Sequence, residues 1–136
     1  MIRKQLSIFV ENEPGVLARV GRALADGGVN LRAVSVSDNC DDAVLRIVVD
    51  DEGRALEILE AAGALAVSRD IIEVALPDRP GALAEIAGVL AEKGFNIGYL
   101  YGSGAVAGSS ARLYFRVNGD AAAADAAIEA HLRAAK

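Results

Sequence analysis

The sequence contains the run Asn12-Glu-Pro-Gly-Val-Leu-Ala18, and a second run, Asp78-Arg-Pro-Gly-Ala-Leu-Ala84, repeats it 66 residues later. Each run is followed at the same interval by a shorter one, Gly28-Val-Asn-Leu31 in the first copy and Gly94-Phe-Asn-Ile97 in the second. Because the register is kept without a gap, we interpret the chain as a duplication, with one domain over 1–69 and another over 70–136. Domains of this size are marginal alone, so each is expected to pack on the other or on a second chain.

The composition excludes several classes of partner. The 136 residues include 14 Lys and Arg against 19 Asp and Glu, and only 4% are aromatic. A net charge of -5 with few rings disfavours nucleic acid, and the same sign disfavours an anionic membrane surface. The single cysteine, Cys40, allows no internal disulfide, which fits a reducing compartment. We therefore expect a cytoplasmic globular protein with no nucleic-acid or membrane partner.

The hydrophobic periodicity predicts the same elements in each half. In the first half these are a strand over 6–10, a helix over 14–27, strands over 30–37 and 43–49, a helix over 52–62 and a short strand over 65–68. A strand over 71–76 begins the second half, whose connection over 102–110 is longer and whose final helix, over 121–134, leaves no room for a last strand. The predicted fold class is α+β, with two tandem ferredoxin-like βαββαβ domains. Each domain has an antiparallel sheet with its helices on one face, and the second copy lacks its last strand.

No residue pattern in the chain predicts catalysis. Cys40 lies beside acidic residues, which disfavour the thiolate, and His131 has no neighbour suited to a ligand set or a triad. The segment 102–108 is rich in glycine but lacks the Gly-Lys-Ser/Thr ending of a phosphate loop. We therefore predict a protein that is not an enzyme and has no catalytic residues, no cofactor and no metal.

The two Pro-Gly turns are the features that suggest binding. Each is predicted to stand at a helix N-terminus, where unpaired N–H groups and the positive end of the helix dipole favour a carboxylate. A purely structural interpretation is also open, in which Asn12 and Asp78 cap the helices. In the same way, Asn30 and Asn96 could be turn residues that follow a helix-ending glycine.

These two runs, each with its following Gly-x-Asn segment, resemble the sequence motif of the ACT domain. Because the motif occurs in both halves, the resemblance covers nearly the whole chain. The resemblance implies a free-standing tandem ACT protein, a non-enzymatic sensor that binds a small amino acid between ACT domains near the Pro-Gly loops. It implies an amino acid as ligand, a homodimer and an amino-acid biosynthetic enzyme as possible partner. Two alternatives remain: a regulatory subunit of an enzyme such as acetolactate synthase, and a structural dimerisation module without a ligand.

The resemblance also supplies candidate ligand-binding residues in both copies. In the serine-regulated ACT domains of phosphoglycerate dehydrogenase, ligand contacts come from the Asn before x-Pro-Gly and the Asn that opens the second strand. Val10 and Leu76 replace a ligand-contacting histidine of that relative, which argues against serine and hints at an aliphatic ligand. The candidate set contains Asn12, Glu13, Pro14, Gly15, Val16, Leu17, Asn30 and Leu31 in the first copy, and Asp78, Arg79, Gly81, Ala82, Leu83, Asn96 and Ile97 in the second.

The length of the first helix constrains how these residues can meet. A helix of about 14 residues separates Asn12 from Asn30 by about 21 Å, too far for one small amino acid to touch both. A ligand that uses both positions must therefore lie between two domains, with Asn12 facing Asn96 within a chain or Asn30 of a partner chain. Because the carboxylate of Asp78 would repel an anionic ligand unless Arg79 compensates, we expect the Asn12 site to bind better.

Overall fold

The computed structural model describes residues 1–39, 42–103 and 110–135. The predicted turn at Cys40 and most of the predicted connection over 102–110 lie outside these residues. The elements run in the order β1 (Ile2–Glu11), α1 (Val16–Asp26), β2 (Leu31–Asn39), β3 (Asp42–Val49), α2 (Glu52–Ala61), β4 (Leu65–Pro77), α3 (Ala82–Glu92), β5 (Asn96–Ser103), β6 (Ser110–Asn118) and α4 (Ala121–Ala134). None of the helices within these ranges is both long and apolar enough to cross a bilayer.

The chain divides into two compact units. The N-terminal unit is Lys4–Arg69, and the C-terminal unit is Asp70–Lys136 together with Met1–Arg3. The strand pairs β1–β3, β2–β3, β4–β6 and β5–β6 are all antiparallel, as predicted for a ferredoxin-like arrangement.

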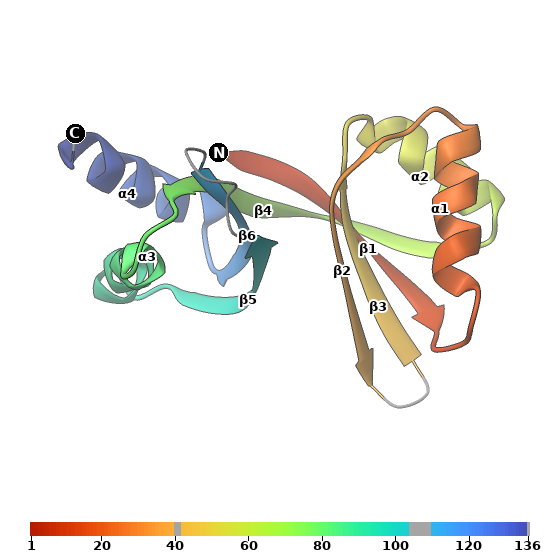
Figure 1. Cartoon of the computed structure of the whole chain (residues 1–136), viewed down its shortest axis with the longest axis horizontal. Coiled ribbons are helices and arrows are strands. Elements are labelled where there is room, and N and C mark those ends of the chain that lie inside the picture. Colours follow the sequence, from red (N-terminus) through yellow and green to blue (C-terminus); the bar gives the residue numbers. More distant parts are fainter. Residues whose placement is uncertain (40–41, 104–109, 136) are drawn as a thin grey trace. The chain divides into compact units, whose positions relative to one another are not determined.

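Both helices of the N-terminal unit cover one face of its sheet (Figure 1). The strand order is β2-β3-β1-β4, so β2 lies at an edge. Alternate residues of β1 and β3 point toward the helices and are buried, because the pleat turns every second side chain to the same face. The core of this unit consists of Leu6, Ile8, Leu24, Val29, Leu45, Ile47, Ala55 and Leu59.

The C-terminal unit repeats this plan. Its strands follow the order β1-β4-β6-β5, with β5 at the edge, and α3 and α4 pack on one face. Its β5–β6 hairpin is two residues longer, since Leu31 pairs with Val49 whereas Ile97 pairs with Val117. The core consists of Ile72, Val74, Leu76, Ala82, Ile86, Leu90, Phe115, Val117, Ala124 and Ile128.

The absence of a last strand from the second copy is confirmed, in that no strand follows α4 in the described part of the chain. Its place beside β4 is taken by the first residues of β1 (Figure 1). The backbone N–H of Glu73 donates to the Met1 carbonyl oxygen at 2.8 Å, and the Met1 amino group donates to the Glu73 carbonyl oxygen at 2.9 Å. Met1–Arg3 therefore completes the sheet of the C-terminal unit.

Three local predictions need correction. The strands predicted over 65–68 and 71–76 are two parts of one strand, β4. The first helix begins at Val16 and not at Pro14, because Gly15 has a left-handed φ of 89°, which a right-handed helix does not accept. Leu17, which the helical period places on the same face as the buried Leu24, is nevertheless 52% exposed.

Candidate functional site

The glycine of each Pro-Gly loop occupies the N-cap position of the following helix. Gly15 precedes α1 with φ 89°, and Gly81 precedes α3 with φ 90°. These conformations strongly favour glycine. The glycines therefore hold the N-cap positions, and Asn12 and Asp78 stand three residues earlier. A capping role of the Asn12 and Asp78 side chains stays a prediction.

The backbone of the loop is the same in both copies. The N–H of Glu13 donates to the Glu11 carbonyl oxygen at 3.0 Å, and the equivalent bond joins Arg79 to Pro77, also at 3.0 Å. The duplication seen in the sequence is therefore also a duplication of local geometry.

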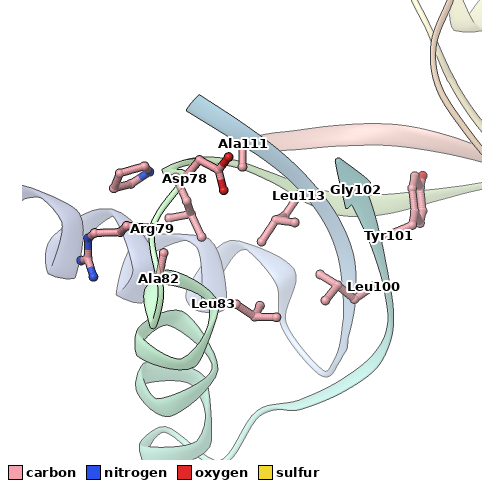
Figure 2. Close-up of a pocket in the computed structure, with 11 residues that line it drawn as sticks. Asp78, Arg79, Ala82, Leu83, Leu100, Tyr101, Gly102, Ala111 and Leu113 are labelled. Carbon is pink, nitrogen blue, oxygen red and sulfur yellow. The ribbon is translucent and has the colours of Figure 1, made fainter. Parts of the chain in front are cut away.

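An open cavity of about 490 Å³ adjoins the second Pro-Gly loop. Of the sequence-predicted residues it is lined by Asp78, Arg79, Ala82 and Leu83. Figure 2 shows the side chains of Leu83, Leu100 and Leu113 directed toward one another. The remaining lining residues are Leu76, Pro77, Tyr101, Gly102 and Ala111. The hydrophobic pattern of β5 and β6 marks Leu100, Tyr101, Gly102, Ala111 and Leu113 only as strand residues, so sequence analysis missed this part of the wall.

Arg79, the residue that could compensate the charge of Asp78, forms an ion pair with another carboxylate. Its Nη2 donates to both carboxylate oxygens of Glu85, at 2.8 and 2.9 Å. Figure 2 shows the Arg79 side chain directed toward α4 and away from Leu83. The Nε2 of His131, on α4, lies 3.9 Å from Glu85. The guanidinium therefore has a carboxylate partner within its own unit.

A second cavity, of about 300 Å³, adjoins the first Pro-Gly loop. It lies between the end of β1, the first turns of α1 and the residues that close α2. Val16 is the one sequence-predicted candidate that lines it. Its charged lining residues, Glu11 and Arg19, were not predicted.

The second-strand candidates lie at the far ends of the helices. Asn30 follows α1, and its N–H donates to the carboxylate of Asp50 at 3.0 Å. Asn96 opens β5 and pairs with Asn118. Leu31 and Ile97 pack against the hydrophobic cores of their units. Neither unit by itself brings its Pro-Gly loop to its second-strand Asn, and the pairing of Asn12 with Asn96 stays a prediction.

Sequence analysis also missed a charge cluster around Glu73 on β4. This carboxylate is 8% exposed and accepts hydrogen bonds from Arg3 Nε at 2.6 Å and from Arg112. Burial alone would raise the pKa of Glu73, but the hydrogen bonds and charges of the two arginines outweigh it and lower the pKa below 4.5. The pKa of Tyr114 is raised, mainly because the side chain is buried and also because it lies close to the negative charge of Glu73.

The described residues contain no group of three or more His, Cys, Asp or Glu arranged to hold a metal ion.

The fold and the repeated Pro-Gly loops define a protein built from two ferredoxin-like modules. The family model of the ACT domain pair matches residues 1–135, so the chain belongs to the ACT domain pair family. ACT domains are regulatory modules.

Several solved structures share this fold. Protein BT0572 from Bacteroides thetaiotaomicron is 33% identical, with a TM-score of 0.83 over 95% of this chain and 85% of that one. The regulatory subunits of aspartate kinase from Thermus thermophilus and Thermus flavus share the fold at 21% and 23% identity. Their TM-scores are 0.69 and 0.68, and the matches cover 95% of this chain and 93% and 94% of theirs. No protein of curated function matches the sequence significantly.

Proposed function

We propose that this chain is a cytoplasmic, non-enzymatic regulatory protein that binds a small amino acid at its Pro-Gly loops. The observation that carries the proposal is that a cavity adjoins each loop, of about 300 Å³ in the N-terminal unit and about 490 Å³ in the C-terminal unit. Volumes of this size suit a small-molecule ligand. The helix that begins at each loop directs its positive end toward an incoming carboxylate.

The ligand acts by stabilising one arrangement of the protein over another, because a ligand shifts an equilibrium only through its differential affinity. Val10 and Val16 line the N-terminal cavity, and Leu76 lines the C-terminal one. These side chains favour a ligand with an aliphatic side chain.

Self-association is part of the proposal. Leu17 and Leu83 occupy equivalent helix positions and are 52% and 45% exposed. Val34 and Leu100 are equivalent residues of the edge strands and are 50% and 37% exposed. Removing such apolar surface from water would stabilise a homodimer. Sedimentation equilibrium of the wild type and of Leu17→Glu tests this, and two monomeric proteins would refute it.

A second candidate function is that of a separate subunit of an amino-acid biosynthetic enzyme. It is favoured by the two Thermus regulatory subunits, which have this fold over nearly their whole length. Affinity purification of the tagged chain from its own cell extract, with identification of any retained enzyme, tests this candidate. An amino acid must then change the activity of that enzyme in the presence of the chain.

A thermal-shift screen against the twenty amino acids tests the main proposal. A ligand at about 100 times its dissociation constant stabilises a protein by about 2.7 kcal/mol, which raises Tm by several degrees. One amino acid is expected to give a saturable shift that Asn12→Ala reduces. A flat response to all twenty would contradict the proposal.

A further inference from the structure

Each unit contains a cavity that is formed by equivalent residues of the duplication. The N-terminal cavity of about 300 Å³ has a counterpart of about 440 Å³ in the C-terminal unit, where it lies between β4, α3 and α4. Six lining positions of the first recur in the second after 66 residues: Phe9, Val10, Glu11, Val16, Arg19 and Val20 become Ala75, Leu76, Pro77, Ala82, Glu85 and Ile86.

The apolar positions keep their character between the copies, whereas the charged positions do not. The N-terminal cavity has a carboxylate at Glu11, where the C-terminal cavity has Pro77. It has a guanidinium at Arg19, where the C-terminal cavity has the opposite charge, at Glu85. The cavities therefore differ in electrostatics although they share an apolar wall.

The pairing of these charges differs as well. In the C-terminal unit, Glu85 accepts two hydrogen bonds from Arg79 Nη2, and Glu129 lies 3.9 Å from the Met1 amino group. In the N-terminal unit, neither Glu11 nor Arg19 forms an ion pair with any residue that the structure describes. The N-terminal cavity thus has one unpaired charge of each sign.

One charge of each sign complements the zwitterion of an α-amino acid. The Arg19 guanidinium can hold a carboxylate with two parallel N–H donors, and the Glu11 carboxylate can accept from an ammonium group. The helix ends favour the same ligand: α1 begins at Val16, with its positive end at the cavity, and α2 closes there through Ala62 and Gly63, with its negative end.

We infer that the cavity formed by Glu11, Arg19 and their apolar neighbours binds a zwitterionic amino acid with an aliphatic side chain. Its C-terminal counterpart, whose carboxylates at Glu85 and Glu129 are already paired, does not. This inference rests on the proposed function and assigns the ligand to the N-terminal unit.

Calorimetric titration of the full chain with each of the twenty amino acids tests the inference. The amino acid that binds is then titrated into Arg19→Gln and Glu11→Gln, and each change is expected to raise Kd at least tenfold. The matched controls are Arg22→Gln, at an exposed position of the same helix, and Glu85→Gln, at the position equivalent to Arg19, and both are expected to leave Kd within twofold. Arg19 and Glu11 are exposed, so the variants should keep the wild-type circular dichroism and Tm.

A second titration uses the primary amine that corresponds to the bound amino acid without its carboxylate. It separates recognition of the carboxylate by Arg19 from a general disturbance of the protein by the substitution. The amine should bind the wild type at least tenfold more weakly than the amino acid, and Arg19→Gln should remove that difference. An amino acid that binds both N-terminal variants like the wild type would overturn the inference and leave the proposed function standing. Binding that is lost in Arg22→Gln or Glu85→Gln would overturn it too. No binding by any of the twenty would overturn both proposals.

Discussion

Met1 and Glu73 exchange a reciprocal pair of backbone hydrogen bonds, at 2.8 and 2.9 Å, across 72 positions of the chain. Through this pair, the first three residues supply the strand that the second copy of the duplication lacks. The same short segment is held a second time, because Arg3 donates to the Glu73 side chain at 2.6 Å. The Met1 amino group also pairs with Asp125 on α4 at 2.7 Å. The integrity of the C-terminal unit therefore depends on the opposite end of the chain.

Replacing Arg3 tests this dependence. In Arg3→Ala the buried Glu73 keeps Arg112 but loses a charged hydrogen bond, which is expected to lower the free energy of unfolding by about 1–3 kcal/mol. Urea denaturation at pH 7 measures the effect. As a control, Arg22→Ala, at an exposed helix position, should change the same quantity by less than about 0.5 kcal/mol. Equal effects of the two changes would show that Arg3 does not stabilise the unit.

The acid sensitivity of the fold should depend on Glu73. Its pKa is below 4.5 in the folded state, so the unfolded chain binds its proton first as the pH falls. The stability that Glu73 contributes is therefore fully present above pH 4.5 and is lost as the pH falls through the folded pKa. Glu73→Gln should be less stable at pH 7 but should lose less stability on acidification. Urea titrations from pH 7 downward test this, and parallel pH profiles for the two proteins would refute it.

Two glycines of β5 give a matched pair of substitutions. A Cβ at Gly102 would collide with the Arg112 carbonyl oxygen and with Leu113, whereas at Gly98 it would meet the Asn118 side chain at 3.5 Å, an ordinary contact. Gly102→Ala should lower the free energy of unfolding by about 1–3 kcal/mol, because the crowded backbone must shift. Gly98→Ala should have a much smaller effect. Thermal denaturation compares them, and a larger loss for Gly98→Ala would be inconsistent with this β5–β6 packing.

The two Pro-Gly loops should differ in their importance for binding. Replacing Asn12 by Ala is expected to raise Kd for the amino acid more than replacing Asp78 by Ala. The reason is that the negative charge of Asp78 opposes a carboxylate, and that Arg79 is engaged by Glu85 at 2.8 Å. Titration calorimetry of both variants gives the order, and the reverse order would contradict the ranking.

Local patterns predicted the order of helices and strands, except that β4 was predicted as two strands. Alternation identified the strands, and the shift of 66 residues identified the duplication. The exceptions have physical causes. The left-handed φ of Gly15 shortens the helix predicted from Pro14, and Arg69 and Asp70, between the parts predicted as 65–68 and 71–76, do not interrupt β4.

Long-range features could not be predicted in this way. The Arg3–Glu73 hydrogen bond joins residues 70 positions apart, and the walls of the cavities come from several elements. One clue was nevertheless present in the sequence. Alignment of the two copies places Arg19 opposite Glu85, a reversal of charge whose meaning becomes clear only when the cavity is seen.

The central claim is that an amino acid binds beside the N-terminal Pro-Gly loop. Titration of the ¹⁵N-labelled full chain, followed by amide chemical shifts, tests it at the level of single residues. The account predicts that one amino acid moves the signals of Gly15, Val16 and Arg19 saturably, while those of the equivalent Gly81, Ala82 and Glu85 change little. Shifts confined to the C-terminal loop, or none with any of the twenty amino acids, would contradict it.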